Sequence, residues 1–147
     1  MTPKLFRSFM VSAGTLLLAT AAAKLVSAGG NARILQDPDP ILAISFRHLF
    51  WIVGVLELVI ALICLFGNQP RLQAGLVAWL ATSFAIYRLA LYLAAYPKPC
   101  HCLGNLTDAL HLSPELADTV MKVILAYLLI GSYAILFWFW KQRETAA

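Results

Sequence analysis

Charged residues are scarce in this 147-residue chain: only 12% of its residues are Asp, Glu, Lys or Arg, whereas 61% are hydrophobic. A soluble domain carries about 25% charged residues, so the composition excludes an ordinary water-soluble fold and indicates a chain surrounded by membrane lipid. The basic residues give a net charge of +4, but they are scattered over the chain ends and helix ends and form no basic stripe. The charge pattern therefore excludes nucleic acid as a partner.

Cysteine is scarce as well. Three cysteines are too few for the disulfide-dense framework of a small secreted domain. Two of them, Cys100 and Cys102, are separated by a single residue. This spacing is the one cysteine pattern in the chain that calls for an explanation.

Long apolar stretches are what the chain has in abundance. Four of them can each cross a bilayer, which takes about 20 helical residues, and Gly, Asn and Pro residues separate them. The predicted spans are residues 5–28, 46–66, 72–96 and 114–141. The prediction is an all-α fold, an integral membrane four-helix bundle that forms a single domain over residues 1–147.

The first stretch has a second interpretation. Lys4 and Arg7, the apolar core that follows and the alanines at 21–23 resemble a secretory signal peptide with a small-residue cleavage site. The apolar run, however, continues to Ala28, which makes it long enough to span. We therefore expect a retained transmembrane helix.

Basic residues near the ends of the spans predict the orientation. Those on one side of the membrane are Lys4, Arg7, Arg71, Lys141 and Arg143. By the positive-inside rule that side is the cytoplasm. The prediction is a multi-pass protein of the bacterial cytoplasmic (inner) membrane, with both termini in the cytoplasm and the cysteine loop outside. That compartment is oxidising, which suits a disulfide.

Four ionisable residues lie within the apolar stretches, where charge is costly and marks candidate functional residues. They are Lys24, Glu57, Arg88 and Lys122. By the rise of a helix, Glu57 lies about 15 Å and Arg88 about 12 Å below the outer surface, on consecutive antiparallel helices. We predict that these two form an ion pair, which either fixes helix packing or takes part in function. Lys24 and Lys122, within about 8 Å of the surface, are expected to extend outward to water.

The outer half of the bundle is predicted to be a positive pocket, because one acid, Glu57, faces several basic groups. These are Lys24, Arg47, His48, Arg88 and Lys122. The sequence requires no cofactor, and the candidate that such a polar interior would suit is a quinone.

The loop after the third span holds the candidate catalytic residues, Cys100 and Cys102. They can close a small, strained ring, and strained exposed disulfides are the labile and catalytic ones. Lys98 and His101 are expected to support them by lowering the pKa of the thiols, and Gly104 permits a positive φ directly after them. The loop therefore predicts a thiol–disulfide oxidoreductase.

Two alternatives remain open. In the first, the disulfide is structural and pins a docking loop, so the protein is a non-enzymatic membrane subunit or assembly factor. In the second, the intramembrane charges line a path for a small molecule or metal. A metal site built on Cys100, Cys102 and His111 lacks a fourth ligand, so no metal site is predicted.

The arrangement of these features resembles the DoxX-like membrane proteins. The resemblance covers nearly the whole chain and rests on four spans, Lys24-Leu25 late in the first and Glu57-Leu58 in the second. The Cys100-x-Cys102-Leu-Gly motif, with Lys122 early in the fourth span, is similar to the branch that contains the methylamine utilisation proteins MauE. Leu103 and His101 stand here where Phe and Gly are usual.

The resemblance implies a redox-associated membrane protein that forms or shuttles disulfides in extracytoplasmic partners. For the methylamine branch, it implies a periplasmic thioredoxin-like helper and a disulfide-containing client, the disulfide-rich subunit of methylamine dehydrogenase.

Overall fold

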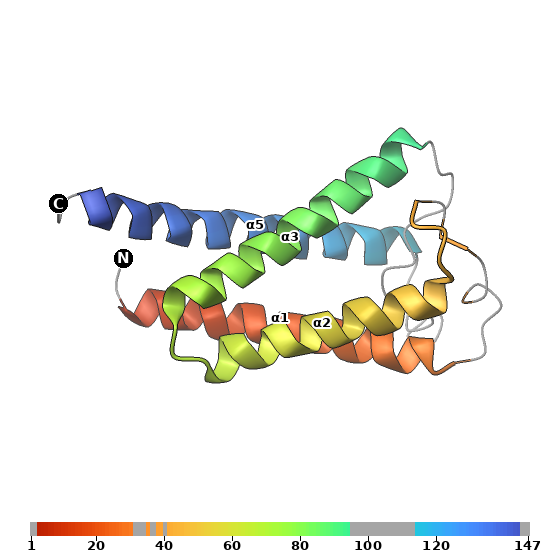
Figure 1. The fold of residues 1–147 in the computed structure, drawn as a ribbon, viewed down its shortest axis with the longest axis horizontal. Helices are drawn as coiled ribbons and strands as arrows, with labels where there is room; N and C mark the ends of the chain where they lie inside the picture. The colour runs from red at the N-terminus through yellow and green to blue at the C-terminus, as the bar shows by residue number, and fades with distance from the viewer. Residues whose placement is uncertain (1–2, 31–34, 36–37, 40, 95–113, 145–147) are drawn as a thin grey trace.

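The computed structural model describes residues 3–30, 35, 38–39, 41–94 and 114–144. The described chain forms four long helices, α1 (Pro3–Ala28), α2 (Phe46–Phe66), α3 (Pro70–Leu93) and α5 (Pro114–Glu144) (Figure 1). Each contains a stretch long and apolar enough to cross a membrane. The prediction of an all-α fold with four apolar helices is confirmed.

The turn between α2 and α3 is closed by a side chain. Gln73, which is buried in the first turn of α3, donates from Nε2 to the backbone oxygens of Ile63 and Gly67, at 2.8 Å each. These bonds tie the first turn of α3 to the last turn of α2, where the Ile63 oxygen also accepts the backbone N–H of Gly67, at 2.8 Å. The helix begins at Pro70, before the predicted start at residue 72, because the first turn of a helix does not need the N–H that proline lacks.

Close helix packing is uneven around the bundle. α1 packs along α2, and α3 packs against α5, with fewer contacts between the two pairs. Small residues allow the first of these approaches: a Cβ added at Gly54 of α2 would lie 3.0 Å from side-chain atoms of Leu25 in α1. Figure 1 shows α3 leaving α2 at their shared turn and separating from it towards Leu93.

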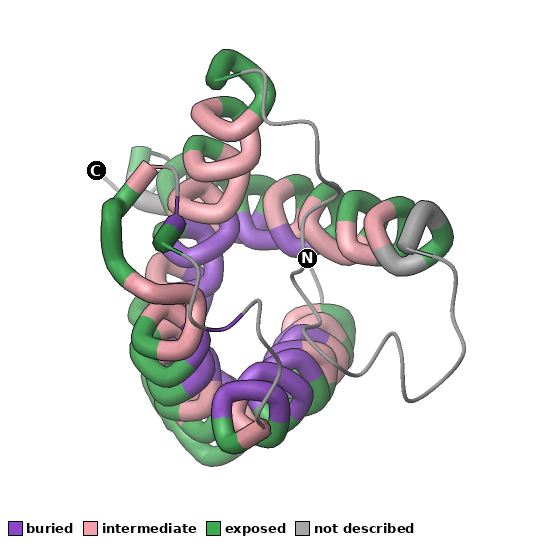
Figure 2. Tube along the Cα trace, turned by 90° about the vertical axis from the view of Figure 1, so that its right-hand side faces the viewer, coloured by how far each residue is buried: buried purple, intermediate pink, exposed green. Residues whose placement is uncertain are grey.

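The buried core runs along the inner faces of all four helices. Its largest members include Met10, Leu17, Ile60, Val77, Leu80, Leu128 and Ile135. Figure 2 shows the buried positions turned towards the centre and the exposed ones outward. Many exposed positions are large and apolar, such as Ile130, which is 72% exposed. An outer surface of this kind is suited to lipid rather than water.

Candidate functional site

The predicted redox residues Lys98, Cys100, His101, Cys102 and Gly104 lie outside the described residues, in the segment 95–113 that joins α3 to α5. The ends of α3 and α5, to which this segment is attached, define the part of the bundle that lies beside it. At that end of the bundle α1 and α3 finish and α2 and α5 begin (Figure 1).

A buried ion pair joins α1 to α2 near this end. Lys24 Nζ donates to both carboxylate oxygens of Glu57, at 2.8 Å to Oε1 and 2.9 Å to Oε2. Lys24 is 5% exposed and Glu57 1% exposed. The ammonium also lies 5.7 Å from the centre of the Phe84 ring of α3, within the range of a cation–π contact. Lys24 is therefore held inside the bundle, and the expectation that it extends outward to water is wrong.

Arg88 pairs with a different acid from the one predicted. Its Nη2 donates to Asp118 Oδ1 near the start of α5, and Lys122 Nζ lies 2.7 Å from the other oxygen of Asp118. The predicted pairing of Glu57 with Arg88 is therefore wrong. The two residues match in depth, but α3 separates from α2 at this end, so Arg88 lies against α5. The Lys122 side chain is 66% exposed, as a lysine near a helix end permits.

The predicted positive pocket is largely neutralised. Sequence reasoning missed Asp118, although its spacing of four residues from Lys122 is the spacing of an ion pair along a helix. Arg47 donates to a backbone carbonyl after the end of α1, at 2.9 Å. His48 Nδ1 lies 2.6 Å from the Ser45 hydroxyl. The basic groups of the outer half are thus engaged locally.

Asp39 fastens the segment between α1 and α2 to α3. Its Oδ1 accepts hydrogen bonds from the backbone N–H groups of Ile41 and Leu42, at 2.9 Å and 2.8 Å, in the manner of an Asx turn. Its Oδ2 accepts a hydrogen bond from the Tyr87 hydroxyl. Asp39 is only 2% exposed. This buried carboxylate therefore fixes the position of the Tyr87 ring.

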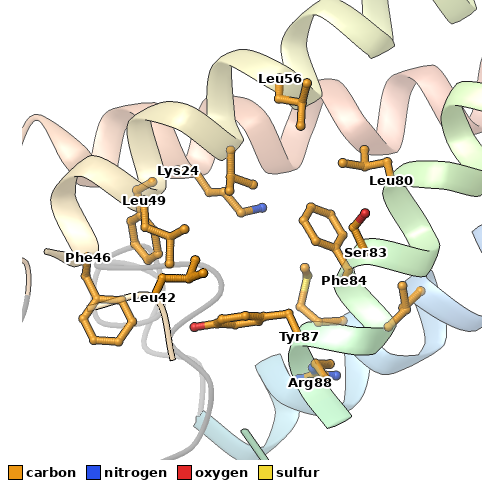
Figure 3. Close-up of a pocket in the computed structure, with 14 residues that line it drawn as sticks. Lys24, Leu42, Phe46, Leu49, Leu56, Leu80, Ser83, Phe84, Tyr87 and Arg88 are labelled. Carbon is orange, nitrogen blue, oxygen red and sulfur yellow. The ribbon is translucent and has the colours of Figure 1, made fainter. Parts of the chain in front are cut away.

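A cavity of about 250 Å³ lies among these groups, with lining residues from all four helices (Figure 3). Most of its wall is aliphatic or aromatic, and its side-chain polar groups belong to Lys24, Ser83, Tyr87 and Arg88. In Figure 3 the Lys24 ammonium points into the space, and Tyr87 reaches from α3 towards Leu42. Among the described residues, no group of three or more His, Cys, Asp and Glu side chains could hold a metal ion. The cavity is suited instead to an apolar molecule with a polar group.

Four apolar helices with a buried charge pair and an apolar outer surface define a multi-pass membrane protein with four candidate spans. A family model described as methylamine utilisation protein MauE matches residues 3–139. The chain therefore belongs to the MauE family, which confirms the resemblance seen in the sequence and links the protein to methylamine utilisation. No curated protein and no solved structure matches the chain.

Proposed function

We propose that Cys100 and Cys102 form a redox pair that exchanges a disulfide with an extracytoplasmic thioredoxin-like protein. The exchange would serve the maturation of a disulfide-containing client, the disulfide-rich subunit of methylamine dehydrogenase. The observation that carries the proposal is the Cys100-His101-Cys102 motif in a chain of the MauE family. The family supplies the link to methylamine utilisation, and the motif supplies the chemistry.

The exchange proceeds through a mixed disulfide. A thiolate of the reduced partner attacks one sulfur of the Cys100–Cys102 disulfide, and the other sulfur leaves as a thiolate. The second thiolate of the partner then attacks its own mixed-disulfide sulfur, which forms the partner's disulfide. Two electrons pass to Cys100 and Cys102, which end as a dithiol. Lys98 and His101 assist by stabilising the leaving thiolate.

The proposed orientation has both termini in the cytoplasm and the 95–113 segment outside. It is supported by the helix ends that carry the basic residues: α1 starts, α3 starts and α5 ends at one end of the bundle (Figure 1). The guanidinium carbon of Arg71 lies 5.6 Å from the centre of the Phe139 ring, so these helix ends are adjacent. A membrane-impermeant maleimide should label the reduced Cys100 and Cys102 in intact spheroplasts. Labelling only after permeabilisation would show that the 95–113 segment faces the cytoplasm and that the proposed orientation is wrong.

Trapping the mixed disulfide tests the exchange. The remaining cysteine of each variant, Cys100→Ser or Cys102→Ser, is first converted to a mixed disulfide with thionitrobenzoate. It is then mixed with a reduced thioredoxin-like partner that lacks its own resolving cysteine, whose thiolate can displace the thionitrobenzoate. We expect one of the two to form a covalent complex that dithiothreitol releases. Cys64→Ser is the matched control, because Cys64 is a free, buried cysteine near the opposite end of α2. This variant should exchange disulfides as the wild type does.

The rival function is that of an assembly factor with a structural disulfide. It predicts that neither single variant traps a partner and that the client matures normally once the thioredoxin-like protein is oxidised by other means. That pair of results would remove the redox role of Cys100 and Cys102 and leave docking as their function.

A further inference from the structure

The cavity described above opens where the two helix pairs separate. α2 and α3 meet at their shared turn and diverge towards Phe46 and Leu93 (Figure 1). Leu49 and Val53 of α2 and Phe84 of α3 line the space of about 250 Å³ that results. The cavity thus lies near the same end of the bundle as the attachment points of the cysteine segment.

Arg88, one of the residues that line this cavity, has a buried hydrogen-bond donor without an acceptor. Its Nη2 is used by Asp118, whereas its Nη1 is buried and has no hydrogen-bond partner in the described part of the chain. Buried donors in folded proteins are nearly always satisfied, because nothing else compensates for the water they lose. The geometry therefore calls for an acceptor atom supplied by a bound molecule.

The charges around the cavity restrict what that molecule is. Lys24 is already paired with Glu57, and Arg88 with Asp118, which Lys122 also contacts. An anionic group such as phosphate would compete with the two carboxylates that already pair with these cations, whereas a neutral carbonyl oxygen can accept from the unpartnered Nη1 of Arg88. The rings of Phe46, Phe84 and Tyr87 add flat apolar surface, which packs well against another ring.

We propose that this cavity binds the head group of an isoprenoid quinone, with one ring carbonyl accepting a hydrogen bond from Nη1 of Arg88. Pockets that enclose a whole drug-sized molecule measure about 300–1,000 Å³. A cavity of about 250 Å³ can therefore take the ring but not the tail, which stays in the bilayer. The apolar wall and the unpartnered Nη1 of Arg88 suit a membrane-soluble carbonyl compound of this class.

The role of the quinone as an electron acceptor rests on the proposed disulfide exchange, whereas the binding of the quinone to the cavity does not. Reduced Cys100 and Cys102 would transfer two electrons and two protons to the quinone. Two S–H bonds break, one S–S bond forms, and the two ring carbonyls become the hydroxyl groups of a quinol. The quinone is then the oxidant that restores the disulfide after each exchange with the partner.

A titration of the full-length protein in detergent with a short-chain ubiquinone analogue tests the proposal by calorimetry. Arg88→Lys retains a cation for Asp118 but removes the free nitrogen, and binding should weaken about tenfold or more, as for the loss of a charged hydrogen bond. Arg71→Lys makes the same chemical change at the opposite, exposed end of α3 and should leave binding unchanged. Leu49→Trp should block the cavity, whereas Ile52→Trp, on the exposed side of the same helix, should not.

Two further measurements distinguish quinone binding in the cavity from binding that depends on the cysteines and from nonspecific partitioning of the quinone into detergent. The alkyl alcohol with the same tail lacks the ring carbonyls and should not compete with the quinone. The double variant Cys100→Ser/Cys102→Ser should bind the quinone as the wild type does, even if disulfide exchange with the partner fails in every assay. Equal binding by Arg88→Lys and wild type, effective competition by the alcohol, or loss of binding in the cysteine variant would each overturn the proposal.

Discussion

Replacing Glu57 with Gln removes the carboxylate that both hydrogen bonds of Lys24 use, and it leaves a buried ammonium without a counter-ion. Breaking a buried pair costs about 3–5 kcal/mol in soluble proteins. Polar contacts between membrane helices are weaker, with a measured maximum of about 1.7 kcal/mol for one contact. Gln keeps one acceptor oxygen, so the counter-charge and one hydrogen bond are lost, and Lys24 is only 5% exposed. We therefore expect the free energy of unfolding to fall by about 2–3 kcal/mol.

A double-mutant cycle measures whether the two residues act together. Glu57→Gln, Lys24→Met and the double variant are unfolded reversibly in mixed micelles. The double variant should recover part of the loss, with a coupling energy of at least about 1 kcal/mol. Lys122→Met is the control, because its 66% exposed side chain predicts a loss of no more than about 1 kcal/mol. If the Glu57 and Lys24 effects simply add, the reasoning from this ion pair is refuted.

The remaining predictions concern helix packing and the loop between α1 and α2. Gly131→Ala should lower stability by about 1–3 kcal/mol, because the added Cβ would meet the Phe9 ring. Gly75→Ala, where a Cβ meets nothing within 4 Å, should raise stability by up to about 1 kcal/mol. Equal effects in micelle unfolding would contradict the packing of α1 on α5. Tyr87→Phe removes a hydrogen bond to Asp39, costs about 1 kcal/mol and should speed amide exchange in that loop. Unchanged exchange would show that the loop is held by other contacts.

The helices could be predicted from the sequence because their cause is local. Inside a bilayer the backbone N–H and C=O groups of a segment must form hydrogen bonds without water. A long apolar run meets this requirement by forming a helix. α2 spans the predicted residues 46–66, and its limits are set by the polar residues on either side. The relative tilt of the helices has no such local cause. It depends on where small residues such as Gly54 allow close packing, and the apolar pattern alone does not contain that information.

The sequence predicted which charged residues lie in the candidate site, but it did not predict which of them form ion pairs with one another. Charges in apolar runs identified Lys24, Glu57, Arg88 and Lys122 because the cost of desolvation is visible in the sequence. Pairing them by depth assumed that α2 and α3 pack side by side along their whole length. The two helices diverge instead, and Glu57 and Arg88 pair with other residues. Asp118 was overlooked because it lies at the edge of the last apolar stretch, where a charge has an ordinary explanation.

The ion pairs that the structure shows explain why a cavity can exist between α2 and α3. The buried Lys24–Glu57 pair joins α1 to α2, and the partly buried Arg88–Asp118 pair joins α3 to α5. Each therefore links two helices that already pack closely. None of the ion pairs among the described residues spans from α2 to α3. A strong buried contact there would hold the two helices together and close the space between them. A molecule can therefore enter between the helix pairs without separating either of these ion pairs, and it can offer an acceptor to the unpartnered Nη1 of Arg88.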